Sequence, residues 1–166
     1  IQMKFIELGL DTEDDLRDST IKISGCPNSC GQHEIATIGF YGGASRIDGT
    51  MTPTYSMMFG GRDGEDGMLG KSVMRVPAKR VIATLIKIIE IYKQERSTNE
   101  SFAMWIEKII NGVSNGNGEI KNLDDIKTVL IQTVSLPSPK DDPESYMDYG
   151  NDVQFIAKTA RGECAA

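Results

Sequence analysis

The decapeptide at residues 24–33, Ser-Gly-Cys-Pro-Asn-Ser-Cys-Gly-Gln-His, constrains this chain more than any other stretch. Its two cysteines, Cys26 and Cys30, are separated by three residues and surrounded by glycine and proline. Proline fixes its own φ and lacks a backbone donor, whereas glycine lets a bulky ligand approach the main chain. Apolar, strand-like runs flank the decapeptide at 21–23 and 35–42. We therefore expect a loop, held by a strand on each side, that points both sulfurs toward one object.

Paired cysteines alone leave the identity of that object open. Zinc sites, redox-active dithiols and iron–sulfur clusters all use them. His33 lies three residues after Cys30 and could complete a zinc site with the two cysteines, with Cys164 as a further candidate ligand. Nothing near Cys164 suggests a ligand loop, so we expect a free thiol there. The residues alone do not decide between a zinc site, a redox-active dithiol and an iron–sulfur cluster.

The whole motif is more specific than its cysteines. Gly-Cys-Pro-Asn-Ser-Cys-Gly-Gln, followed by an apolar strand ending in Gly-Phe-Tyr-Gly, resembles the second cluster motif of the siroheme-dependent sulfite and nitrite reductases. In that family an upstream C-x5-C pair and this C-x3-C pair together bind a 4Fe–4S cluster. The last cysteine also bridges the cluster to the siroheme iron.

The resemblance implies roles for five residues. Cys26 would be a cluster ligand, and Cys30 would be both a cluster ligand and the axial ligand of siroheme. Asn28, between the cysteines, would hydrogen-bond cluster sulfur or fix the loop, and Gly31 would let the cofactor approach the backbone. Arg62 follows a Gly-Gly pair that lies near the cofactor in the family. It could pair with a siroheme carboxylate, and the alternative is a surface residue without that role.

The upstream cysteine pair is not found here, since the sequence holds only three cysteines and none precedes Cys26. The chain opens on residues 1–9, which read as an amphipathic helix with a glycine stop rather than an initiator methionine. We therefore expect a C-terminal piece of a longer reductase, the parent reductase. Its N-terminal half would supply the other cluster ligands, and the piece alone would be inactive.

Composition excludes several function classes. The chain has 166 residues, 39% hydrophobic and 25% charged, as in globular proteins. A net charge of −6 argues against a nucleic-acid binder. No apolar run reaches the roughly 18 residues that span a bilayer. The glycine-rich run 61–70 lacks the Gly-Lys-Ser/Thr ending of a phosphate loop and carries acidic residues. Few cysteines and no leader suggest reduced thiols and a cytoplasmic protein.

The apolar patterns predict an α+β fold like the nitrite/sulfite reductase 4Fe–4S domain. We expect an antiparallel sheet from strands near 20–25, 35–42 and 54–60, backed by helices at 78–96 and 99–111. Ser97 and Glu100 match a capping box before the second helix, and Asn122 can cap a third. We expect residues 1–112 to form the C-terminal half of the reductase domain. Residues 113–166 would add a helix and an extended tail packed on it.

By this resemblance the parent reductase performs the six-electron reduction of sulfite to sulfide or of nitrite to ammonia, with ferredoxin or a flavoprotein as electron donor. Its catalytic acids and bases would lie outside this piece. Two rival functions remain. One is a non-enzymatic zinc module using Cys26, Cys30 and His33, and the other is a structural interaction domain in which the two thiols have no role.

Overall fold

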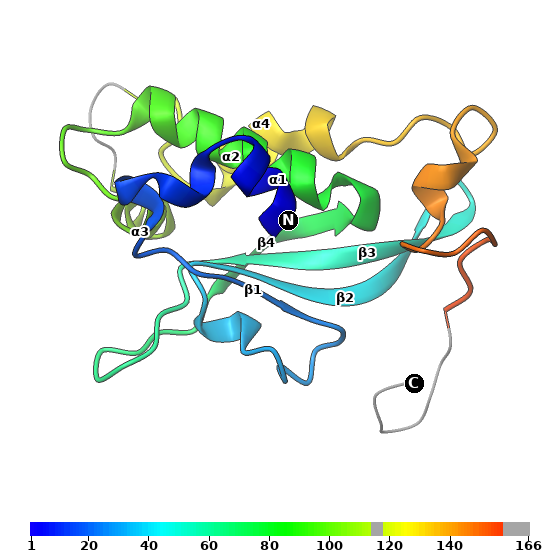
Figure 1. Cartoon of the computed structure of the whole chain (residues 1–166), viewed down its shortest axis with the longest axis horizontal. Helices are drawn as coiled ribbons and strands as arrows, with labels where there is room; N and C mark the ends of the chain where they lie inside the picture. The colour runs from blue at the N-terminus through cyan, green and yellow to red at the C-terminus, as the bar shows by residue number, and fades with distance from the viewer. Residues whose placement is uncertain (114–117, 158–166) are drawn as a thin grey trace.

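The computed structural model describes residues 1–113 and 118–157. Four strands form one sheet in the order β1-β2-β3-β4, namely β1 (Ile21–Ser24), β2 (Ile38–Ile47), β3 (Thr50–Phe59) and β4 (Lys71–Pro77) (Figure 1). The pair β2–β3 is antiparallel, as predicted, and β3–β4 is antiparallel too, but β1 pairs with β2 in parallel. The sheet is therefore mixed. Parallel pairing is possible because residues 25–37 are long enough to return the chain to the start of β1, where Ile38 meets Ile21.

Two details of the sheet differ from the prediction. Strand β2 continues through Gly42–Gly43 to Ile47, because both glycines stay paired with β3, and it turns at Asp48–Gly49. Both turn residues have positive φ (47° and 78°), as tight hairpin turns require. Strand β4 was not predicted. A bulge in the β3–β4 register falls at Val73, so the buried residues Val73 and Val76 do not follow a two-residue alternation.

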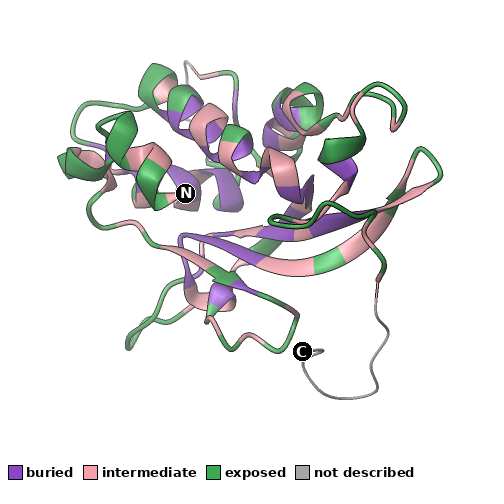
Figure 2. Cartoon of the chain, turned by 45° about the vertical axis from the view of Figure 1, so that its right-hand side comes forward, coloured by how far each residue is buried: buried purple, intermediate pink, exposed green. Residues whose placement is uncertain are grey.

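Four helices cover one face of the sheet (Figure 1). They are α1 (Gln2–Glu7), α2 (Val81–Glu95), α3 (Phe102–Asn111) and α4 (Leu123–Val134). Figure 2 shows buried residues concentrated between these helices and the sheet. The core joins Phe40, Met57 and Phe59 of the sheet to apolar side chains of α2, α3 and α4. Gly9 follows α1 with φ 69°, which confirms the predicted glycine stop. No helix in the described part of the chain is long and apolar enough to cross a bilayer.

Helix α3 begins later than predicted. Its N-cap is Ser101, whose hydroxyl accepts the backbone N–H of Met104 at 3.4 Å. The predicted capping box at Ser97 and Glu100 is therefore wrong in position. Glu100 does accept the backbone N–H of Ser97 at 2.8 Å, but its side chain is buried and pairs with Lys108 at 2.5 Å. The pairing of Ser97 with Glu100 therefore indicates a local hydrogen bond and does not mark the start of α3.

Helix α4 carries the predicted cap. The side chain of Asn122 accepts the N–H groups of Asp124 (2.8 Å) and Asp125 (3.2 Å), and Asp125 completes a capping box. Ile126 and Leu130 of this helix belong to the same core as the sheet. The domain boundary after residue 112 stays a prediction.

We expect Asn122→Ala to lower the free energy of unfolding by about 1 kcal/mol, because two helix N–H groups lose their acceptor. Denaturant unfolding followed by circular dichroism measures this change. The matched control is Asn111→Ala at the exposed last residue of α3. Its expected change is below about 0.5 kcal/mol. Equal effects of the two substitutions would contradict the capping role of Asn122.

Candidate cofactor site

The cysteine loop, residues 25–32, lies on the side of the sheet away from the helices (Figure 1). It connects β1 to a short 3-10 helix, His33–Ile35. Two of its residues, Ser29 and Gln32, have positive φ (58° and 56°), and the N–H of Gln32 donates to the carbonyl of Ser29 at 2.7 Å. Non-glycine residues rarely adopt this left-handed backbone. The loop is therefore tightly wound and needs support from its surroundings.

That support comes from beneath the loop. The Ser24 hydroxyl is buried and accepts the backbone N–H of Gly31 at 3.1 Å. A Cβ on Gly31 would lie 2.4 Å from the carbonyl oxygen of Ile23, so only glycine lets the loop rest on β1 this closely. Packing thus accounts for Gly31, whose contact with a cofactor stays a prediction.

Cys26 and Cys30 line one open cavity of about 430 Å³. Cys26 is half-buried and Cys30 is exposed. The other walls come from β2, β3 and the C-terminal segment, which contribute Gly42, Gly43, Ala44, Pro53, Thr54, Tyr55, Asp148, Phe155 and Ala157. Both cysteines of the loop therefore border the same space, and their role as cofactor ligands stays a prediction. Asn28 is exposed and does not line the cavity, so its predicted supporting role stays a prediction.

The C-terminal segment, residues 147–157, was not predicted to reach the cysteines. It is anchored by Tyr146, which is buried and donates its hydroxyl to the carbonyl of Pro137 at 2.8 Å. Lys79 adds a contact over the ring of Tyr149 at 4.4 Å. Beside the cavity, burial raises the pKa of the Tyr55 phenol, and the Asp148 carboxylate raises it further. Tyr55 therefore presents a neutral hydroxyl at neutral pH.

His33 faces the interior. Its side chain is 1% exposed, its Nδ1 lies 2.8 Å from the Ser24 hydroxyl, and its ring packs on Tyr41 with centroids 4.9 Å apart. Within residues 1–113 and 118–157, no group of three His, Cys, Asp or Glu side chains is placed to hold a metal. The zinc interpretation therefore gains no ligand from His33. Cys164 lies outside the described residues.

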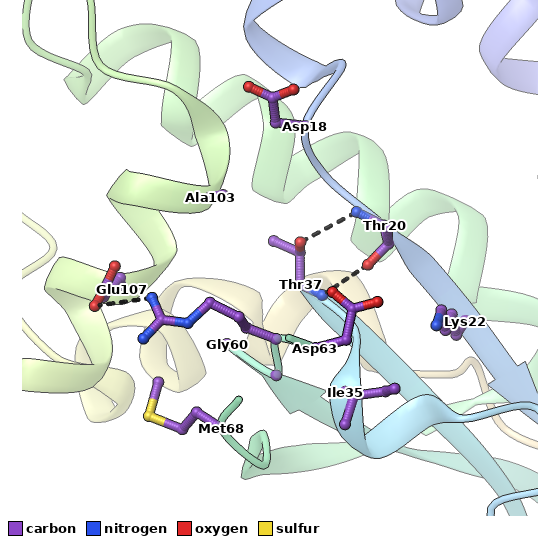
Figure 3. A pocket seen from close by; sticks show the side chains of 12 residues that line it. Asp18, Thr20, Lys22, Ile35, Thr37, Gly60, Asp63, Met68, Ala103 and Glu107 are labelled. Atoms are coloured by element: carbon purple, nitrogen blue, oxygen red, sulfur yellow. Dashed lines mark hydrogen bonds and ion pairs between the residues drawn. The ribbon is translucent and has the colours of Figure 1, made fainter. Parts of the chain in front are cut away.

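Arg62 lines a separate hollow of about 160 Å³ (Figure 3). Its guanidinium lies 3.6 Å from the carboxylate of Glu107 on α3, and its Nε donates to the carbonyl of Asp66 at 3.0 Å. None of the residues that line this hollow also lines the cysteine cavity. The neighbouring Gly61 packs against the 3-10 helix, since a Cβ there would lie 2.2 Å from the carbonyl oxygen of Glu34. A contact between Arg62 and the cofactor stays a prediction that this geometry does not favour.

Comparisons with known proteins agree with the fold and the motif. The model of the nitrite and sulphite reductase 4Fe-4S domain matches residues 17–110. The assimilatory ferredoxin-dependent nitrite reductase of Haloferax mediterranei is 27% identical over 106 residues, which cover 63% of this chain and 18% of that protein. The ferredoxin–nitrite reductase of Synechococcus elongatus is 43% identical over 70 residues, 42% of this chain and 14% of that protein. The ferredoxin sulfite reductase of Mycobacterium tuberculosis is 32% identical over 92 residues, 52% of this chain and 16% of that protein.

A solved structure shows the same architecture. The NirA protein of Mycobacterium tuberculosis superimposes with a TM-score of 0.53 and 25% identity, covering 73% of this chain and 22% of NirA. This likeness supports the predicted fold class. The chain spans less than a fifth of the length of the curated relatives described above. Because the family model matches more than half of its residues, the chain belongs to the family of the nitrite and sulphite reductase 4Fe-4S domain.

Proposed function

We propose that this chain is the cofactor-holding part of a siroheme-dependent nitrite or sulfite reductase. Cys26 and Cys30 would be two of the four cysteine ligands of a 4Fe–4S cluster, and Cys30 would also help to hold siroheme. The observation that carries this proposal is that both cysteines of the family's loop line one open cavity.

The residues present fit half of such a site. Thiolates are the usual ligands of iron–sulfur clusters, which normally take four of them. The cavity is lined by two cysteines. Its walls also include Gly25, Gly42 and Gly43, which have no side chain and would let a cofactor come close to the backbone. The remaining two ligands would come from the N-terminal half of the parent reductase.

When bound, the coupled cluster and siroheme would supply electron transfer to the substrate anion, for the six-electron reduction of nitrite to ammonia or of sulfite to sulfide. The part of this chain is to hold its two sulfurs in place. Its tightly wound loop and the glycine contacts with β1 fix the backbone that carries them. We place the groups that bind the anion and deliver protons outside this chain, so the chain alone is expected to be inactive. The parent reductase would act in the cytoplasm.

The names of the relatives point to ferredoxin as the electron donor, and a flavoprotein is the alternative. These relatives act on nitrite or on sulfite, so both anions belong in the test. The test is turnover by the parent reductase with reduced ferredoxin, and separately with a reduced viologen dye, on each anion. We expect formation of ammonia from nitrite or of sulfide from sulfite. A parent that holds iron but reduces neither nitrite nor sulfite would overturn the proposed reaction.

A further inference from the structure

Ser24 stands at the centre of a buried chain of hydrogen bonds below the cysteine loop. It is the last residue of β1 and is paired in register with Tyr41 of β2. Its hydroxyl accepts the N–H of Gly31 at 3.1 Å and lies 2.8 Å from Nδ1 of His33. A hydroxyl can accept and donate at the same time. When the imidazole carries its proton on Nε2, the bonds run from the Gly31 amide to the Ser24 hydroxyl and on to Nδ1 of His33.

The far end of this chain is fixed by the sheet. The ring of His33 is held against Tyr41, and both Ser24 (4% exposed) and His33 (1% exposed) are shielded from water. The backbone of His33 touches β2 so closely that a Cβ on Gly39 would lie 1.9 Å from the His33 carbonyl oxygen. His33 therefore has little room to shift, and it anchors Ser24.

The near end of the chain lies next to a cysteine. Gly31 directly follows Cys30, and residues with positive φ stand on both sides, Ser29 before and Gln32 after. Strained conformations of this kind persist only where the surrounding structure enforces them. A second side-chain contact of this part of the loop, Lys22 Nζ to Gln32 Oε1 at 3.0 Å, is exposed. The buried bond to Ser24 is the better-protected constraint on this turn.

We propose that Ser24 and His33 are a positioning pair, which sets the place of the Cys30 sulfur before any cofactor is bound. The inference rests on the proposed function, because the position of Cys30 matters chiefly if Cys30 is a ligand. The bond from Gly31 to Ser24 orients the peptide between residues 30 and 31. The cysteine loop then presents its second thiol in one arrangement, and less ordering is needed when a cofactor binds.

The first test needs no cofactor. In the whole chain carrying Cys164→Ser, the rates of alkylation of Cys30 and Cys26 by iodoacetamide are compared under anaerobic conditions by peptide mass spectrometry. We expect Ser24→Ala and His33→Leu to change the ratio of the two rates at least threefold. Hydrogen exchange at the Gly31 amide should become at least tenfold faster in Ser24→Ala. Ser24→Thr, which keeps the hydroxyl, should restore both values.

The control is Thr84→Val, which removes a buried hydroxyl bound to the carbonyl of Arg80 in the region of α2, away from the loop. It should leave the ratio unchanged. Any one of three results would overturn the proposal. The ratio of the two alkylation rates could stay unchanged in Ser24→Ala, or change equally in Thr84→Val. Ser24→Thr could also fail to restore the ratio.

A second arm separates this proposal from the proposed function. In the parent reductase, purified anaerobically, Ser24→Ala should shift the electron paramagnetic resonance signal of the reduced cluster, and Ser24→Thr should not. If the wild-type parent holds no iron, the proposed function fails, while the alkylation ratio still decides whether Ser24 positions Cys30. If iron is bound and the ratio does not respond, only the positioning pair fails.

Discussion

Replacing Cys30 with serine in the parent reductase is expected to abolish reduction of nitrite and sulfite. We expect the turnover rate to fall at least about a hundredfold, since even outer residues around a metal site cost about tenfold to a hundredfold when changed. A serine hydroxyl stays protonated and is a poor ligand, whereas a cysteine binds metal as the thiolate. In the proposed site Cys30 would bind both the cluster and siroheme, so both would be affected. Turnover with a reduced viologen dye measures the loss without relying on the natural electron donor.

The control for this variant is Cys164→Ser, because it makes the same chemical change at a cysteine outside the loop motif in the sequence. We expect it to keep the full rate. A Cys30→Ser parent that retains more than about a tenth of the wild-type rate would contradict the assignment, since changes to outer residues of a metal site already cost about tenfold or more.

The substitution Gly39→Ala is expected to have the largest effect on stability among the glycine changes in β2. Its Cβ would lie 1.9 Å from the carbonyl oxygen of His33, so β2 and the 3-10 helix must separate. Overpacking of this kind costs typically 1–3 kcal/mol and sometimes more, and we expect a loss of about 3 kcal/mol in the free energy of unfolding. Denaturant unfolding of the whole chain measures it.

Gly43→Ala provides a matched control on the same strand. Nothing lies within 4 Å of a Cβ at Gly43, and its φ is not positive. We expect a change of no more than about 1 kcal/mol, in the stabilising direction, because alanine restricts the unfolded chain. A Gly39→Ala chain as stable as Gly43→Ala would show that the contact between β2 and His33 is looser than described.

The sequence was most informative about local features. Spacing and residue type predicted the cysteine loop between two strands, the long helix near 78–96 and the cap at Asn122. The strand after the loop begins at Ile38 and not at residue 35, because residues 33–35 form a 3-10 helix. Each of these features depends on contacts between residues near one another in the chain. Helix caps and hydrophobic periodicity are signals of this local kind.

The features that depend on distant contacts were missed or misplaced. Parallel pairing of β1 follows from the path of residues 25–37, and no alternation pattern reports the direction of a strand. Strand β4 was hidden by its bulge. The C-terminal segment reaches the cavity because Tyr146 is anchored on Pro137. The role of Ser24 depends on His33 and Gly31, which meet it only after the loop has folded back.

The central claim is that Cys26 and Cys30 hold an iron–sulfur cluster coupled to siroheme in the parent reductase. It is tested most directly by an anaerobic absorption spectrum and an iron count on that parent, beside its Cys30→Ser variant. We predict siroheme bands and about five irons per parent chain, four in the cluster and one in siroheme, with both signals lost in the variant. A colourless parent that holds zinc, or no metal, would contradict the claim.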